Sequence, residues 1–378
     1  MSLCAQRTRL SRFQSRGVLR LPAGVRCLAS PASAPSSSPA IDFDNLKFGL
    51  TETDSMFVAH FDAQDPRGSS WRGGLEPYGD LRVHPSAAVL NYGQGCFEGL
   101  KAFTTAKGRV VTFRPYENAR RMASGAVELA MPPVPEEFFV DAVRQVVRAN
   151  LRFVPPEGKG ALYVRPLLIG TGPVLGLAPA PSFTFLVYVS PVGAYFKGGK
   201  LTPISLLVEE GRCRAAPGGV GDVKYIGNYS QTLRCQLPAK KQGFADVVYL
   251  DASDSELIEE VSSCNIFAVR GRQIITPRLG SILPGITRAS VIEIARARGY
   301  EVMEAPLRIG DVLSSDEVFC TGTAVVVSPV GSLTYKGVRH EFQNGNVGKV
   351  SQEIYTALTD MQHERAEDSF GWLDEIQS

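Results

Sequence analysis

The sequence of 378 residues lacks the spacings that bind metal ions or build a histidine-centred catalytic triad. Its seven cysteines include no C-x-x-C pair, and its four histidines are far apart, with no H-x-x-x-H. A zinc site or a hydrolytic triad therefore has little support, and we predict no metal site. Five cysteines, an odd number, follow residue 40, so free thiols in a reducing compartment fit better than disulfides.

Long apolar runs and a strong excess of one charge are absent as well. The nearest approach to a long run, FTFLVYV at residues 183–189, has the length of a strand, so we expect no membrane span. The formal net charge of +2 depends on the first 40 residues, because 34 basic residues face 38 acidic residues beyond them. This balance gives no electrostatic footprint for nucleic acid.

The first 40 residues contain six arginines, no lysine and no acidic residue, and they end in SPASAPSSSPA. The arginines lie mostly three to four positions apart, as a cationic amphipathic helix would place them. This composition is typical of an organellar transit peptide, which we place at residues 1–40; a disordered basic tail is the competing interpretation. We expect a mitochondrial location because arginine starts early and recurs, and the Ser/Pro-rich end makes the chloroplast the alternative.

Three segments make specific predictions about helices. Residues 136–150 predict an amphipathic helix, because their apolar positions share one face. In LPGITRASVIEIARARGY, residues 283–300, a tight turn precedes a helix with Thr287 as the expected N-cap and Gly299 as the expected stop. Pro238 is expected to end or kink the helix-like segment that precedes it.

The length of the chain exceeds what one hydrophobic core usually supports, so two domains are expected. Strand-like and helix-like segments are mixed on both sides of a stretch rich in glycine and lysine, residues 196–203. We predict an α+β fold with a smaller N-terminal domain at 41–195, a linker at 196–203 and a larger domain at 204–378.

One lysine, Lys224, follows three glycines in the stretch APGGVGDVKYIGNYSQ, residues 216–231. A phosphate-binding loop would need a second glycine and a hydroxyl where the chain has Val223 and Tyr225, so that hypothesis fails. A surface lysine is the other interpretation. The glycines let the backbone approach a ligand closely, and apolar neighbours such as Val223 and Ile226 imply partial burial. Burial disfavours the charged form of a lysine, and carbonyl chemistry requires a neutral amine.

The stretch GGVGDVKYIGNY resembles the lysine motif of the branched-chain-amino-acid aminotransferases, which are fold-type-IV (class IV) pyridoxal-phosphate enzymes. The resemblance runs from about residue 45 to the C-terminus and points to the plant-like organellar form. It implies a smaller N-terminal α/β domain, a larger C-terminal pseudo-barrel domain, and a homodimer with active sites close to the subunit interface. Seven further segments resemble the family in the same order: NYGQGCFEGLKAF (91–103), FRPYENARRM (113–122), LYVRPLLIG (162–170), SPVGAYF (190–196), EEVSSCNIF (259–267), ILPGITR (282–288) and FCTGTAVVVSPV (319–330).

The reaction implied by this resemblance is the exchange of an amino group between two small molecules. L-Leucine, L-isoleucine or L-valine plus 2-oxoglutarate would give the branched 2-oxo acid plus L-glutamate. Pyridoxal 5'-phosphate would be held as a Schiff base on Lys224, and the freed lysine would then move the proton between substrate and cofactor. Location and supply, rather than the sequence, decide between biosynthesis and breakdown.

The resemblance also implies how the cofactor is held. Glu260 would keep the pyridine nitrogen protonated and Tyr229 would bond the 3′-oxygen, while Arg121, Thr323 and the amides of Ile286 and Thr287 at a helix N-terminus would bind the phosphate. Glu259 could be misassigned for Glu260, but adjacent residues on an extended segment face opposite ways, and the spacing to SSCNIF selects Glu260. Arg120 could be misassigned for Arg121, and one of these two is then a solvated helix arginine. The implied cofactor-binding residues are Arg121, Lys224, Tyr229, Glu260, Ser263, Ile286, Thr287 and Thr323.

For the substrate, the resemblance implies an aromatic pocket and two carboxylate sites. Aromatic walls would favour branched side chains, since burying each CH₂ is worth about 0.8 kcal/mol. Arg165 would bind the distal carboxylate of glutamate, and the amides of Thr323 and Ala324 would bind the α-carboxylate. Val325 and Ser328 stand where some animal relatives carry a C-x-x-C pair, so we expect no thiol switch there. The implied substrate-binding residues are Tyr92, Phe97, Tyr163, Arg165, Tyr195, Thr323 and Ala324.

Other functions share parts of this pattern. D-Amino-acid transaminases and aminodeoxychorismate lyases have the same lysine and phosphate sites, but Tyr92 with the FEGLKAF and YVRP segments favours L-amino acids. The pocket residues do not distinguish a transaminase of methionine-derived oxo acids. A non-enzymatic pyridoxal-phosphate binder would need neither an electron sink nor a proton shuttle, so the presence of both Lys224 and Glu260 argues against it.

Overall fold

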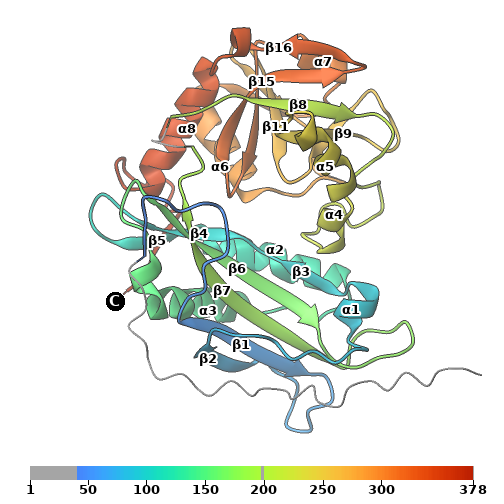
Figure 1. The fold of residues 1–378 in the computed structure, drawn as a ribbon, viewed down its shortest axis with the longest axis vertical. Helices are drawn as coiled ribbons and strands as arrows, with labels where there is room; N and C mark the ends of the chain where they lie inside the picture. The colour runs from blue at the N-terminus through green and yellow to red at the C-terminus, as the bar shows by residue number, and fades with distance from the viewer. Residues whose placement is uncertain (1–40, 197–199, 378) are drawn as a thin grey trace, which may run out of the picture. The chain divides into compact units, whose positions relative to one another are not determined.

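The structure is a computed structural model that describes residues 41–196 and 200–377. The predicted transit peptide at 1–40 and positions 197–199 of the predicted linker therefore lie outside the described residues. The described residues from Asp42 onward form one compact unit, and its strands belong to two sheets (Figure 1). In the part of the chain that the structure describes, no helix is long and apolar enough to cross a membrane.

The first sheet is antiparallel and has the strand order β17-β5-β4-β6-β7-β1-β2, with β3 pairing to β6. Helix α3 packs on β1, β6 and β7, and α2 packs on α3. The elements of this part are β1 (Ser55–Asp62), β2 (Arg72–Pro77), α1 (Ala88–Tyr92), β3 (Gly95–Phe97), β4 (Leu100–Thr104), β5 (Val110–Phe113), α2 (Pro115–Glu128), α3 (Glu136–Ala149), a 3₁₀ turn (Leu151–Phe153), β6 (Gly160–Gly170) and β7 (Ser182–Gly193).

The second sheet is mixed, with the order β10-β9-β8-β15-β14-β11-β12-β13 and with β16 pairing to β15. Helices α6 and α8 contact each other and strand β14, and α5 contacts β9. The elements here are β8 (Ile204–Glu209), α4 (Gly227–Ser230), α5 (Leu233–Lys241), β9 (Asp246–Leu250), β10 (Ile258–Val261), β11 (Asn265–Arg270), β12 (Gln273–Thr276), α6 (Ile286–Ala297), β13 (Glu301–Glu304), α7 (Ile309–Leu313), β14 (Glu317–Gly322), β15 (Val326–Tyr335), β16 (Val338–Glu341), a 3₁₀ turn (Gln343–Gly345) and α8 (Lys349–Gln362); the last strand of the chain, β17 (Leu373–Glu375), belongs to the first sheet.

The C-terminal strand β17 returns to the first sheet, although the strands before it from β8 onward belong to the second. Leu373 pairs with Phe113 on β5, and the ring of Trp372 packs edge-on against Phe113 at 5.6 Å between centroids. One apolar cluster also contains buried residues of both sheets, among them Phe103 on β4 and Phe267 on β11. The division at residues 195 and 204 into two domains stays a prediction.

The helix predicted at residues 136–150 is α3, Glu136–Ala149, and it buries six apolar side chains against the sheet. The prediction for Thr287 was wrong: Thr287 is not an N-cap, because α6 already begins at Ile286 with Gly285 as its N-cap and without a side-chain cap. Pro238 lies inside α5 and does not end it, while the kink that was the other expectation stays a prediction. Arg234, whose carbonyl loses its helical partner, is exposed, so that carbonyl can bind water instead.

Candidate active site

One cavity collects all eight residues for which the sequence implied a role in cofactor binding. It lies among the loop before α4, the end of β10, the start of α6 and the end of β14, with Arg121 of α2 reaching in from the first half of the chain. The lining residues are Arg121, Arg214, Lys224, Tyr229, Glu260, Ser262, Ser263, Cys264, Asn265, Leu283, Gly285, Ile286, Thr287, Thr321, Gly322 and Thr323.

Lys224 is half-buried, and its amine lies among aromatic groups. Its Nζ atom donates to the hydroxyl of Tyr229 at 3.2 Å, and it lies 4.8 Å from the ring centroid of Phe97. The backbone of Lys224 is held as well, because its carbonyl accepts a bond from the amide of Phe97 at 3.1 Å. The amine therefore has a defined position inside the cavity, and a surface lysine is excluded.

The glycine-rich loop before Lys224 is held by contacts that the sequence did not suggest. A side chain at Gly221 would place its Cβ 2.1 Å from the carbonyl oxygen of Ser281, so the two loops touch backbone to backbone. Buried Asn228 donates from Nδ2 to the carbonyls of Val220 at 2.7 Å and Val223 at 3.1 Å. Asn228 was missed because no local pattern distinguishes a loop-bracing asparagine from a turn residue.

Glu260 lines the cavity and is 3% exposed. Its carboxylate accepts bonds from Nδ2 of Asn265 at 2.9 Å and from the amide of Leu283 at 3.2 Å, and it forms an ion pair with Arg214. Burial raises the pKa of Glu260 to about 7, and the charge of Arg214 opposes that rise. Glu259, the neighbour that could have been misassigned, lines a different cavity.

Arg121, which also lines the cavity, forms a second buried ion pair. Its Nε and Nη2 atoms donate to the two carboxylate oxygens of Glu98 at 2.7 Å each, and Nη1 donates to the carbonyl of Pro284 at 2.9 Å. Glu98 is fully buried. The sequence analysis missed it, because the sequence does not show that this acid of the FEGLKAF segment is buried or which residue compensates its charge. Arg120 instead pairs with Glu117 on the surface.

The start of helix α6 provides free amides beside Arg121. No side chain caps this helix, and its first residues, Ile286 and Thr287, line the cavity. The amides of a first helical turn have no partner within the helix and favour an anion. A side chain at Gly285 would place its Cβ 2.1 Å from Oδ1 of Asn265, so only glycine fits at this N-cap.

A strained turn closes the cavity on the side of β14. Thr323 donates from Oγ1 to the carbonyl of Gly99 at 3.2 Å, and Nζ of Lys101 donates to the carbonyl of Ala324 at 2.9 Å. Val326 follows with φ of +62°. A β-branched residue in the left-handed region costs roughly 1–3 kcal/mol and is often found at functional sites, which supports a role for this turn.

The residues with implied substrate roles fall into two groups. Phe97 lies next to Tyr229 with ring centroids 4.8 Å apart, and Arg165 lies over Phe97 with its guanidinium carbon 4.9 Å from the ring centroid. Tyr163 joins this group, since its hydroxyl accepts a bond from Nη2 of Arg165 at 3.3 Å. Phe48, which the sequence did not suggest, packs edge-on against Tyr163 at 5.3 Å between centroids.

Of the residues with implied substrate roles, Thr323 lines the cavity around Lys224 and the other six do not. The first group lies beside the cavity through the contacts of Phe97 with Lys224 and Tyr229, and Tyr92, Tyr195 and Ala324 form the second group. Tyr195 is 50% exposed and lines a neighbouring cavity together with Ala324. Tyr92 is 38% exposed, and its hydroxyl donates to the carbonyl of Leu175. Their implied contacts with substrate stay predictions.

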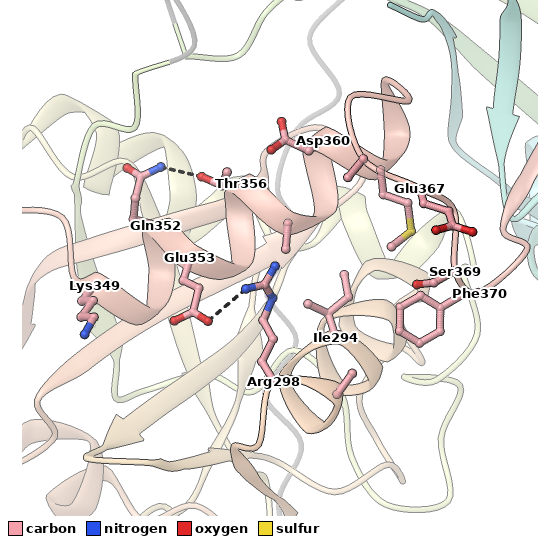
Figure 2. A pocket seen from close by; sticks show the side chains of 14 residues that line it. Ile294, Arg298, Lys349, Gln352, Glu353, Thr356, Asp360, Glu367, Ser369 and Phe370 are labelled. Atoms are coloured by element: carbon pink, nitrogen blue, oxygen red, sulfur yellow. Dashed lines mark hydrogen bonds and ion pairs between the residues drawn. The ribbon is translucent and has the colours of Figure 1, made fainter.

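A separate groove of about 660 Å³ lies between α6 and α8 (Figure 2). It has an apolar floor that includes Ile294 and Phe370, and an ion pair of Arg298 with Glu353 at 3.2 Å lies across it. None of the residues with implied roles lines it. The groove does contain an amine and acids, among them Lys349, Glu353 and Glu367, but they lie outside the short motifs to which the resemblance gave roles.

The donor set of the smaller cavity fits pyridoxal 5'-phosphate. The amine of Lys224 and the carboxylate of Glu260 suit its aldehyde and its ring nitrogen, and Arg121 with the start of α6 suits its phosphate. Two buried hydroxyls in the lining, those of Ser262 and Thr321, have no hydrogen-bond partner among the described residues. Buried polar atoms without partners are uncommon, and a polar ligand would satisfy them.

Comparisons with known proteins agree with this geometry. Residues 95–333 match the family described as amino-transferase class IV. A chloroplastic branched-chain amino acid aminotransferase of Humulus lupulus is 53% identical over 338 residues, which cover 89% of this chain and 82% of that protein. A mitochondrial one of the same species is 50% identical over 337 residues, 89% of this chain and 84% of that protein.

A solved structure also matches over most of the chain. The branched-chain amino acid aminotransferase of Escherichia coli superposes with a TM-score of 0.74 and 28% identity, covering 86% of this chain and all of that one. The fold prediction, α+β of the class IV type, is confirmed. The chain therefore belongs to the class IV aminotransferases and, within them, to the pyridoxal-phosphate-dependent branched-chain amino acid aminotransferases.

Proposed function

We propose that this enzyme transfers the amino group of L-leucine, L-isoleucine or L-valine to 2-oxoglutarate, with Lys224 as its catalytic residue. The observation that supports this most directly is the shared cavity of the Lys224 amine and the Glu260 carboxylate. When bound, pyridoxal 5'-phosphate supplies an electron sink for the negative charge that develops at the substrate Cα.

The remaining roles, binding the cofactor and moving the proton, belong to residues of the chain. Lys224 would hold the aldehyde end of the cofactor until the substrate amine displaces it, and the freed amine, oriented by the Tyr229 hydroxyl at 3.2 Å, would then take the proton from the substrate Cα. Glu260 would pair with the ring nitrogen and favour its protonated form. Arg121, Ser263, Thr323 and the amides of Ile286 and Thr287 would hold the phosphate end and so keep the reacting atoms in position.

Removing the charge of Arg121 is expected to weaken cofactor binding and to destabilise the fold. In Arg121→Met, the phosphate loses its cation and buried Glu98 loses its partner; breaking a buried pair costs about 3–5 kcal/mol. Arg120→Met is the matched control, because its surface pairs are worth about 0–1 kcal/mol. Thermal melts with and without cofactor measure both effects, and equal melting temperatures for the two variants would contradict the assignment of Arg121.

Arg165 is expected to discriminate between the two substrate classes. Its guanidinium is largely buried over Phe97 and Tyr163, and its Nε atom has no partner among the described residues. In Arg165→Met, we expect KM for 2-oxoglutarate to rise by about 10- to 100-fold, because a charge-assisted hydrogen bond is worth about 1.5–3 kcal/mol. KM for 4-methyl-2-oxopentanoate, which has no second carboxylate, should change less than about threefold. Equal changes for the two acids would refute this role.

The substrate preference is tested by a screen of the purified protein. We expect L-leucine to react with 2-oxoglutarate faster than D-alanine does, and faster turnover of D-alanine would overturn the proposal. Transamination of L-methionine is the second candidate, because a methionine aminotransferase of Arabidopsis thaliana is 42% identical over 338 residues, 89% of this chain and 94% of that protein. A higher kcat/KM for L-methionine than for L-leucine would favour this second candidate.

We propose that the enzyme is a homodimer and that an apolar patch near Tyr92 takes part in the interface. Leu90 is 62% exposed, and Leu175 and Leu177 are 91% and 87% exposed. The bond from Tyr92 to Leu175 ties α1 to the loop that carries these leucines. Exposed apolar patches of this kind often mark interfaces. Light scattering should give twice the mass of the chain, and a monomer at micromolar concentration would contradict the proposal.

The protein is organellar, and we propose the mitochondrion as its location, with the chloroplast as the alternative. The arginine-rich residues 1–40 support import, and relatives of both locations match the chain. Imaging a fluorescent fusion of residues 1–60 decides between them.

We also propose that residues 41–195 and 204–378 act as two domains joined at 196–203, which limited proteolysis within that linker would test.

A further inference from the structure

We propose that Arg214 is a positioning residue that keeps Glu260 ionised toward the ring nitrogen of the cofactor and ties it to the loop of Lys224. This inference rests on the proposed function. It assigns a role to a residue that carries no sequence motif of its own and that lines the same cavity as Lys224 and Glu260.

The contacts of Arg214 join three segments of the chain. The residue lies in the loop between β8 and α4 and is 4% exposed. Its Nη2 atom forms the ion pair with Glu260 and also donates to the carbonyls of Gly221 at 2.8 Å and Ser281 at 3.1 Å. Its own carbonyl accepts a bond from Nε2 of Gln231 at 2.7 Å. One guanidinium thus fixes the acid relative to the loop that carries the catalytic amine.

The charge of Arg214 matters because two adjacent acids are buried here. Glu259 and Glu260 are 2% and 3% exposed, and burial raises the pKa of each. For both acids, Arg214 is the main opposing charge. Among the described residues, Glu260 has no other ion-pair partner. Without Arg214, Glu260 would more readily hold a proton itself, and a neutral acid stabilises a protonated ring nitrogen less well.

A purely structural role of Arg214 and the proposed electrostatic role make different demands on the side chain. The bonds to the carbonyls of Gly221 and Ser281 need only a hydrogen-bond donor, whereas keeping Glu260 ionised needs a positive charge. Arg214→Lys and Arg214→Gln both lose the planar guanidinium and both keep a donor, but only lysine keeps a charge. Arg212→Gln is the control, because Arg212 is exposed in the same loop.

The experiment is ¹⁵N NMR of each holoenzyme loaded with pyridoxal 5'-phosphate that carries ¹⁵N in its ring. We expect a protonated ring nitrogen in the wild type, in Arg214→Lys and in the Arg212 control, and loss of that signal in Arg214→Gln. We also expect kcat of Arg214→Gln to fall by about tenfold or more, since a charge-assisted bond is stronger than a neutral one by roughly 1.4 kcal/mol.

Three results would overturn the role of Arg214: a protonated nitrogen in both variants, its loss in both, or failure of both to retain cofactor. The last of these would make Arg214 purely structural. An unprotonated nitrogen in the wild type, or a wild type that does not transaminate, would instead refute the proposed function. Glu260→Gln separates the two cases, because it should lose the protonated signal even if Arg214 proves irrelevant.

Discussion

Alanine at position 224 is expected to abolish transamination and to remove the visible absorbance of the covalently held cofactor. The variant loses both the point of attachment and the group that moves the proton at the substrate Cα. A positioned acid–base group alone contributes about 10²- to 10⁴-fold, so we expect turnover to fall by at least about 10⁴-fold once attachment is lost as well. Absorbance spectra and stopped assays with L-leucine and 2-oxoglutarate measure the two effects.

The control for this experiment is Lys240→Ala, because Lys240 is an exposed lysine on α5. It should retain both the absorbance and the turnover of the wild type. A colourless wild type, or a Lys224→Ala protein with turnover within tenfold of the wild type, would show that another group does the chemistry.

Glu260→Gln is expected to lower turnover by about 10- to 100-fold while most of the cofactor is retained. Glutamine keeps the shape of the side chain but removes the charge that favours a protonated ring nitrogen, and a hydrogen bond to a charged group is worth about 1.5–3 kcal/mol. Arg214 would at the same time lose its partner inside the protein, so the melting temperature should fall as well. Turnover and cofactor content are measured on the same preparation.

Glu259→Gln is the matched control for Glu260→Gln. It removes the same charge from the adjacent buried residue, which lines a different cavity. We expect its turnover to stay within about threefold of the wild type. If the two variants lost activity equally, the effect would come from net charge or folding and not from contact with the cofactor.

The residues with implied cofactor roles could be selected from the sequence because each lies in a short contiguous motif, and their contacts with the cofactor stay predictions. Lys224 follows a glycine-rich loop, and Ile286 and Thr287 begin a helix, so the motif itself fixes the local geometry. The cavity accordingly brings together residues from segments that are far apart in the sequence. Local predictions that rest on the propensity of a single residue were less accurate. Pro238 lies inside α5, and Gly285 rather than Thr287 is the N-cap of α6.

The residues that sequence reasoning missed act through distant partners. Glu98 has a role only because Arg121 of α2 faces it, and Arg214 only because Glu260 of β10 faces it. An isolated charge in a sequence does not reveal whether it is buried or which residue compensates it. Pairing between buried groups is a property of the folded chain, and a single sequence without its structure does not carry it.

The central claim, that Lys224 and no other lysine holds the cofactor, is tested most directly by chemical fixation. The holoenzyme is reduced with borohydride, digested and mapped by peptide mass spectrometry across its 11 lysines. We predict that the added mass of the reduced cofactor appears on the peptide with Lys224 at close to one per chain. Its appearance on a different lysine, or on none, would contradict the account.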